Sequence, residues 1–176
     1  MKEVERDWEM EEEEWEEPEL EEEERELVTD ADVLAAEALT NRRLLTLLLM
    51  LASGPKYASS IAEVIPHSTA HRLLRKLEEL GVVASYKGVD GRRRYYKLTE
   101  RGEAVLNNVT RVLRNYVAKL FRKYGKRVSS GYILEPGLLK KAVEEQLGVP
   151  LSLIVGFLGL SVYKYYGEEV YLLEER

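Results

Sequence analysis

Two neighbouring stretches of the chain gather the side chains that could carry out recognition chemistry. Residues 67–80 read HSTAHRLLRKLEEL, and residues 82–98 contain the run GRRRYYK. A guanidinium group can donate two parallel hydrogen bonds to a phosphate, or to the O6 and N7 atoms of guanine. Chemistry of this kind binds a polyanion, and it needs neither a nucleophile nor an acid–base pair.

The stretch 67–80 predicts an amphipathic helix. Its apolar residues, from Ala70 to Leu77, recur at helical spacing and form an inward face. The first turn of a recognition helix enters the major groove of DNA, and Ser68 or Thr69 also stands where a helix N-cap belongs. Arg72 is the best candidate for direct reading of a base. The predicted contacts to double-stranded DNA from this helix are His67, Ser68, Thr69, His71, Arg72 and Arg75.

The stretch 82–98 predicts a hairpin, because Asp90-Gly91 is a favoured turn between two short strands. The alternation of a strand puts Arg94 and Tyr96 on one face and Arg93 on the other, and we expect Tyr96 and Leu98 to pack inward. The hairpin would reach the phosphate backbone or a narrow minor groove. Its alternative role is a basic edge strand that charge protects from aggregation. The predicted contacts are Lys87, Arg92, Arg93 and Arg94.

Helices on the N-terminal side must position these two stretches. The segment YASSIAEVI predicts a short helix that ends in a tight turn at Pro66. Before it, Thr40 or Asn41 caps an apolar core helix, RRLLTLLLMLA, which Ser53-Gly54-Pro55 ends. An earlier helix is expected from Asp30 or Asp32 to about Leu39. The order of helix, turn, recognition helix and basic hairpin predicts a winged helix-turn-helix.

A long helix is predicted over roughly 100–124, followed by Gly125. Its apolar stripe either forms a dimer interface or packs on the chain's own domain. We expect dimerisation, since recognition of two half-sites needs two copies. The stripe consists of Leu106, Val109, Leu113, Tyr116 and Leu120.

The C-terminal residues 126–176 predict a helical, apolar subdomain. PGLLKKAVEEQLG reads as a helix that Gly148 closes. Gln146 to Tyr163 is uncharged, and tyrosines and Lys164 cluster at its end. This segment is expected to be a buried helix, a pair of strands or part of a dimer interface, and membrane association is the less favoured alternative.

Charge is distributed unevenly along the chain. Residues 1–30 hold 17 acidic and 3 basic residues, whereas residues 31–127 hold 8 acidic and 19 basic ones. Residues 1–29 predict a disordered acidic tail, because so few apolar groups cannot offset the entropy of ordering. Trp8 and Trp15 could anchor this tail on a protein partner, or on the chain's own basic face in place of DNA.

Other functions find little support in the composition. The chain has no cysteine, which excludes disulfides and thiolate metal sites. His67 and His71 are its only histidines and lack further ligands, so we expect no metal, no cofactor and no enzyme active site. The first residues do not resemble a signal peptide, and we expect a cytoplasmic protein. Abundant Glu, Lys, Arg and Tyr beside a single Gln favour an archaeal or thermophilic source.

The runs STAHRLLRKLEELGVV and GRRRYYKLTERG, with ALTNRRLLTLLLMLASGP before them, resemble the ArsR/MarR/PadR group of prokaryotic winged-helix regulators over about residues 38–104. The resemblance implies a dimeric transcriptional regulator, often a repressor that an effector releases. Metal-sensing ArsR-like proteins use cysteines that this chain lacks.

The expected fold is mainly α with a small β wing, in the α+β class. Its expected parts are a tail (1–29), a winged helix-turn-helix domain (30–98), a dimerisation helix (99–125) and a C-terminal subdomain (126–176). The expected function is a dimeric DNA-binding regulator that reads the major groove with helix 67–80 and the backbone or minor groove with wing 82–98. The alternative is a winged-helix assembly or accessory module of the transcription, replication or ribosome machinery.

Overall fold

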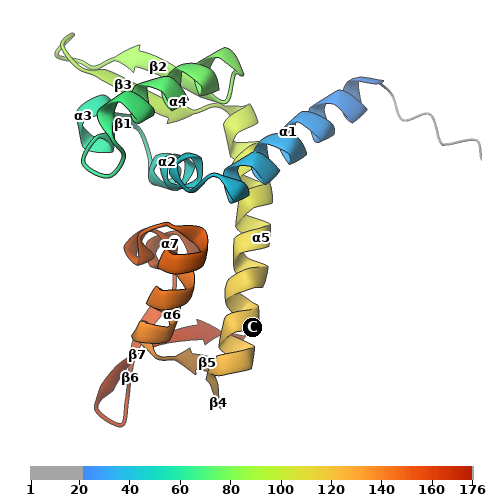
Figure 1. The fold of residues 1–176 in the computed structure, drawn as a ribbon, viewed down its shortest axis with the longest axis vertical. Helices are drawn as coiled ribbons and strands as arrows, with labels where there is room; N and C mark the ends of the chain where they lie inside the picture. The colour runs from blue at the N-terminus through green and yellow to red at the C-terminus, as the bar shows by residue number, and fades with distance from the viewer. Residues whose placement is uncertain (1–21, 176) are drawn as a thin grey trace, which may run out of the picture.

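A long helix, α5, connects the two halves of the molecule in the computed structural model (Figure 1). The structure describes residues 22–175, with side chains from residue 31 onward. The winged-helix half lies at the N-terminal end of α5, and a second α+β module lies at its C-terminal end. No helix within the described residues is long and apolar enough to cross a membrane.

The first half contains five helices and three strands, counting α5. They are α1 (Glu22–Thr40), α2 (Arg42–Ala52), β1 (Lys56–Tyr57), α3 (Ala58–Ile61), α4 (His67–Glu79), β2 (Val83–Lys87), β3 (Arg94–Leu98) and α5 (Glu100–Tyr124).

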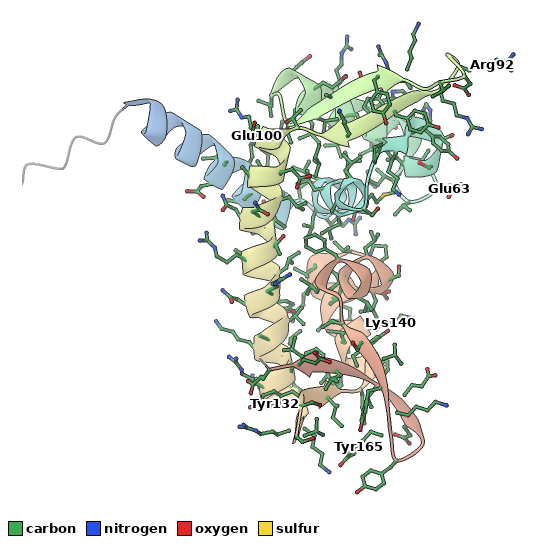
Figure 2. All side chains as sticks on the ribbon, turned by 180° about the vertical axis from the view of Figure 1, so that it is seen from behind. Glu63, Arg92, Glu100, Tyr132, Lys140 and Tyr165 are labelled. Atoms are coloured by element: carbon green, nitrogen blue, oxygen red, sulfur yellow. The ribbon has the colours of Figure 1, made fainter. Side chains whose placement is uncertain are left out.

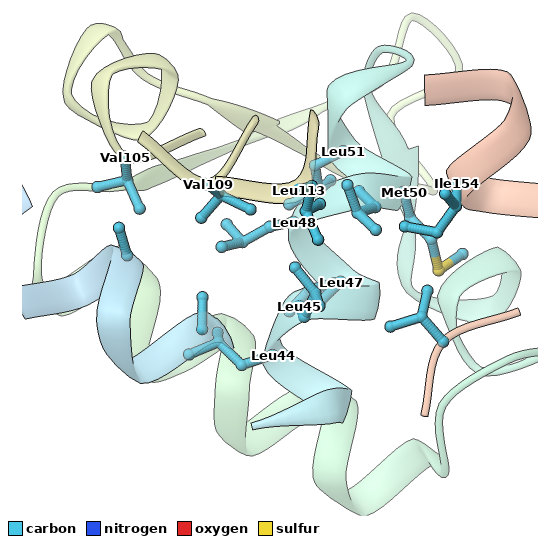
Figure 3. Close-up of a cluster of buried hydrophobic side chains, with 14 of the residues drawn as sticks. Leu44, Leu45, Leu47, Leu48, Met50, Leu51, Val105, Val109, Leu113 and Ile154 are labelled. Carbon is cyan, nitrogen blue, oxygen red and sulfur yellow. The ribbon is translucent and has the colours of Figure 1, made fainter. Parts of the chain in front are cut away.

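Helix α2 lies at the centre of the fold. The side chain of Asn41 accepts hydrogen bonds from the backbone N–H groups of Arg43 and Leu44, so Asn41 is the N-cap, one of the two predicted candidates. All eight residues from Leu44 to Leu51 are buried. Helices α1, α5 and α7 (Leu151–Leu158) and strand β3 contact α2. Figure 3 shows leucines of α2 packed against valines of α5 and against Ile154.

Helix α1 begins earlier than the sequence analysis predicts. Residues 22–29, expected to belong to a disordered tail, are helical, and the helix continues to Thr40 without a break. Glu, Leu and Arg have good helix propensity, and the packing of Ala31, Leu34 and Ala38 in the core anchors the second half of the helix. The remaining tail, residues 1–21, lies outside the described residues.

Strand order confirms the winged helix. The first sheet is antiparallel with the order β1-β3-β2, so the short β1 between α2 and α3 joins the hairpin that follows α4. Tyr96 pairs with Ser85 and is buried, as predicted, whereas Leu98 is half-buried. Helix α3 is shorter than expected, with only four residues, because the chain turns at 62–65 before Pro66.

Helix α5 starts directly at the base of the wing. Thr99 is its N-cap: the hydroxyl accepts a hydrogen bond from the N–H of Gly102 and donates to the carbonyl of Gly81. Gly102 lies against the hairpin, where an added Cβ would stand 2.2 Å from the carbonyl oxygen of Val82. The close approach of α5 to the wing therefore requires a glycine.

The apolar stripe of α5 serves the chain's own core. Leu106, Val109 and Leu113 are at most 6% exposed, and α1 and α2 contact this helix. The two remaining members, Tyr116 and Leu120, pack against the same core and are half-buried. The prediction that this stripe is a dimer interface is wrong for the three buried residues, because α1 and α2 of the same chain cover them.

The C-terminal half contains a sheet that the sequence analysis did not resolve. Its strands are antiparallel in the order β4-β5-β7-β6. In the sequence, Gln146 to Tyr163 was treated as one apolar segment. In the structure this segment divides at Gly159, with α7 before that residue and a strand after it. The elements of this half are β4 (Lys126–Val128), β5 (Gly131–Leu134), α6 (Pro136–Ala142), the π-helix η1 (Val143–Leu147), α7, β6 (Ser161–Tyr165) and β7 (Glu168–Glu174).

We predict that Gly102→Ala destabilises the protein, because the new methyl group would force α5 away from the Val82 carbonyl. The expected loss is about 1–3 kcal/mol in the free energy of unfolding, measured by urea denaturation. Gly137→Ala in α6 is the control, since nothing lies within 4 Å of its Cβ position. That variant is expected to be unchanged or more stable by up to about 1 kcal/mol. Equal effects of the two substitutions would contradict the packing argument.

Candidate nucleic-acid interface

One face of helix α4 packs against the core, and the opposite face is exposed. Pro66 precedes its first residue and takes the N-cap position with no side-chain hydrogen bond, so the expectation that Ser68 or Thr69 caps the helix is wrong. Ala70, Leu73, Leu74 and Leu77 are buried. The first-turn N–H groups are uncapped by a side chain, and the helix dipole makes this end attractive to a phosphate.

A groove between α4 and the wing collects cationic side chains. Arg94 of β3 and the buried Tyr96 form its wing side, and Arg72 and Arg75 of α4 form the other. All three arginines are exposed. The groove is lined by His71, Arg72, Arg75, Lys76, Glu78, Glu79, Arg94 and Tyr96.

The charge of this groove changes along α4. Its basic residues come from the first two and a half turns, whereas Glu78 and Glu79 stand at the C-terminal end of the helix. Lys76 at the boundary is paired with Glu37 of α1, with 2.5 Å between Nζ and Oε1. A phosphate chain is therefore attracted to the beginning of α4 and repelled from its end.

Thr69 does not belong to the exposed face. It is 9% exposed, and its hydroxyl accepts a hydrogen bond from the Arg43 guanidinium at 3.1 Å. The prediction of Thr69 as a DNA contact is therefore wrong. The contact instead ties the first turn of α4 to the start of α2. The sequence analysis did not assign this role to Arg43, since only the packing brings the two residues together.

The wing tip is a six-residue loop that hydrogen bonds hold in shape. The Asp90 carboxylate accepts hydrogen bonds from the backbone N–H groups of Arg92 at 3.1 Å and Arg93 at 3.3 Å. Gly91 has a φ of +65°, which a residue other than glycine would adopt with strain. Arg92 projects from the outermost part of the wing (Figure 2).

The three wing arginines have different surroundings. Arg94 lies in the groove beside Tyr96, on the face of the strand that was expected to pack inward, and Arg92 is exposed at the tip. The Arg93 guanidinium lies 4.7 Å from the centre of the Tyr57 ring, which also makes an edge contact with Tyr95. Arg93 is thus held against β1 by a cation–π contact. Lys87 is exposed at the end of β2, opposite Arg94.

Among the described side chains, His67 and His71 have no further candidate metal ligand beside them. Their rings are 4.4 Å apart in an edge arrangement on the exposed start of α4. No cluster of three or more candidate ligands exists within residues 22–175. Their position is compatible with the predicted contacts of His67, Ser68 and His71 to a partner, since all three are exposed.

No protein-family model and no curated protein matches the chain. Solved structures similar to it are transcriptional regulators. One described as belonging to the MarR family, from Enterococcus faecalis V583, is 18% identical, with 61% of this chain and 96% of that chain covered and a TM-score of 0.48. The repressor BigR from Xylella fastidiosa is 20% identical, with coverages of 55% and 96% and a TM-score of 0.42.

A third similar structure is the adhesin competence repressor AdcR from Streptococcus pyogenes. It is 22% identical, with 58% of this chain and 82% of that chain covered and a TM-score of 0.41. The assignment of the winged helix rests on the order of helices and strands in this chain, not on these overlaps.

We predict that the wing-tip turn loses stability in acid. The backbone hydrogen bonds from Arg92 and Arg93 hold the pKa of Asp90 below its ordinary value of 3.8. Because the pKa of Asp90 is lower in the folded protein than in the unfolded chain, the stabilisation by its carboxylate is present above pH 3.8. This stabilisation is lost as the pH falls through the pKa of Asp90 in the folded protein. The amide resonances of Arg92 and Arg93 should titrate by NMR with a midpoint below 3.8. Asp90→Asn is the control and should abolish this titration, and a midpoint above 3.8 would contradict the turn geometry.

Proposed function

We propose that this protein is a sequence-specific, double-stranded DNA-binding transcriptional regulator that acts as a homodimer. The observation that carries the proposal is the groove in which Arg72 and Arg75 of α4 face Arg94 of the wing. Helix α4 is the recognition helix and enters the major groove with its first turns. The wing follows the phosphate backbone or the adjacent minor groove.

We infer different tasks for the cations. Arg72 lies in the second turn of α4, exposed and on the groove side, where a bidentate contact to guanine is possible. Arg75, Arg94 and the tip residue Arg92 meet phosphates, which fix the register of the protein on the duplex. Arg93 supports the wing from the opposite side through Tyr57.

We expect the triple variant Arg92→Ala, Arg93→Ala, Arg94→Ala to lose specific binding to the preferred site and to flatten the salt dependence of what remains. Each lost phosphate contact reduces the slope of log affinity against log salt by about 0.9. Sites are first selected by sequencing the genomic fragments that the protein retains, and affinities are then measured by fluorescence anisotropy.

The matched control removes three exposed cations of the C-terminal half, Lys140→Ala, Lys141→Ala and Lys164→Ala. This control changes the net charge by the same amount as the wing variant but removes no predicted DNA contact. It should therefore leave the slope of log affinity against log salt unchanged. The proposal fails if the two triple variants bind DNA alike. Failure of the unmodified protein to retain any DNA would favour a role in protein assembly.

Arg72→Lys tests base readout separately. A lysine keeps the charge but cannot form the bidentate contact, so the loss should be about 1–3 kcal/mol against one base pair of the site. Binding to unrelated sequences should stay the same. A uniform loss on all sequences would place Arg72 on the backbone instead.

A further inference from the structure

A second groove with a different character lies at the other end of α5. Its floor is apolar, with buried Val117, Leu160 and Leu172 and half-buried Leu158 and Leu173. Arg114 and Arg122 of α5 stand exposed along one rim, and the exposed Glu174 and Glu175 also line the groove. The groove encloses about 740 Å³, a size typical of binding sites. It lies between α5, the end of α7 and strands β6 and β7 of the second sheet.

This groove borders the most uniformly basic part of the chain. Residues 104–134 contain seven Lys and Arg and no Asp or Glu, and all seven cations are exposed. Arg122 lies 3.6 Å from Glu175. Arg111, Arg114 and Lys119 contact no carboxylate within residues 31–175. Like charges so close together repel one another, so an anionic partner would stabilise this face.

DNA seated on α4 does not account for these cations. Arg122 lies 23 residues after Thr99, which caps α5 at the base of the wing. At 1.5 Å per residue the distance along α5 is about 35 Å. Because α5 runs away from the winged helix (Figure 1), a duplex on the recognition helix does not extend to this groove.

The N-terminal segment has the complementary chemistry. Residues 1–21 hold 12 acidic and 2 basic residues, together with Trp8 and Trp15, the only tryptophans of the chain. Carboxylates suit the arginine rim, and indole rings suit an apolar floor. A chain of this length spans up to about 70 Å, several times the distance of about 12 Å along α5 between Arg114 and Arg122.

The direction of α1 favours the segment of a second copy. Among the side chains described from residue 31 onward, Asp32 of α1 accepts a hydrogen bond from Asn108, and Glu37 pairs with Lys76. Glu22 lies about 15 Å farther along the helix from Asp32, and this first half of α1 projects away from the rest of the fold (Figure 1). Glu22, where the acidic segment joins α1, therefore lies at the end of the helix that points away from its own fold, which favours a binding site on a second copy.

We propose that residues 1–21 of one copy dock in the groove between α5 and the C-terminal sheet of a second copy, and that the reciprocal exchange forms a dimer. Glutamates pair with Arg114 and Arg122, and a tryptophan covers Leu158, Leu160 and Leu173. The proposal is independent of DNA binding, but it supplies the dimer contact that the buried stripe of α5 cannot.

Two full-length variants test the exchange by complementation. The groove variant carries Arg114→Glu and Arg122→Glu. The arm variant carries Glu11→Lys, Glu12→Lys, Glu13→Lys and Glu14→Lys. Sedimentation velocity should show a dimer for the unmodified protein and a monomer for each variant alone. A mixture of the two should form a heterodimer, because the intact arm of one chain meets the intact groove of the other.

Two controls separate this contact from charge and from DNA binding. Lys140→Glu with Lys141→Glu makes the same charge change on α6 and should remain dimeric. The wing variant Arg92→Ala, Arg93→Ala, Arg94→Ala should also remain dimeric. Unchanged melting curves verify that all variants fold.

The outcomes are distinct. A monomeric unmodified protein, a dimeric groove variant or a mixture that stays monomeric would each overturn the proposal. A wing variant that becomes monomeric would place the acidic segment on the DNA-reading face and overturn the assigned groove. Raising the ionic strength should weaken the dimer about tenfold or more in dissociation constant, since exposed charge pairs are screened by salt.

Discussion

Helix α2 imposes the main constraint on this fold, because it is apolar around its whole circumference and must be covered on every side. Eight consecutive residues, from Leu44 to Leu51, are buried, and each large apolar side chain contributes about 1.5–3 kcal/mol on burial. An ordinary surface helix buries only one stripe of its side chains. Here the wing, α5, α1 and α7 all pack around α2, so the winged helix and the C-terminal module share one core.

This shared core fixes α4 and the wing relative to α5. The start of α4 is tied to α2 through Arg43 and Thr69, and the wing is tied to α5 through Thr99 and Gly102. The groove between α4 and β3 therefore has rigid walls, while its functional side chains project into solvent. Rigid elements with exposed cations are what recognition of a duplex requires.

The recognition elements could be predicted from local sequence, and the remaining contacts could not. The amphipathic spacing of 67–80 and the Asp90-Gly91 turn gave α4 and the hairpin, with Arg72 and Arg75 on the exposed face of the helix. The strand alternation grouped Arg94 with Tyr96, but only the structure shows that this face borders a groove. Thr69 was misassigned because its position on the helix is close to the border between the two faces, and only Arg43, 26 residues away, decides its role. The second sheet was missed because its strands are short and β5 pairs with β7 across an intervening helical segment.

The sequence alone determined the elements whose signals are local: the capped apolar helix, the amphipathic helix α4, the wing and the separation of acidic from basic segments. Periodicity, turn residues and charge act over a few neighbours, so they can be read along the chain. Tertiary structure decided whether an apolar stripe is buried within the chain and which elements cover it. Leu106, Val109 and Leu113 have the same pattern in a dimer interface as in a core. The placement of α1 against α5 makes them core, because burial depends on contacts between residues far apart in sequence.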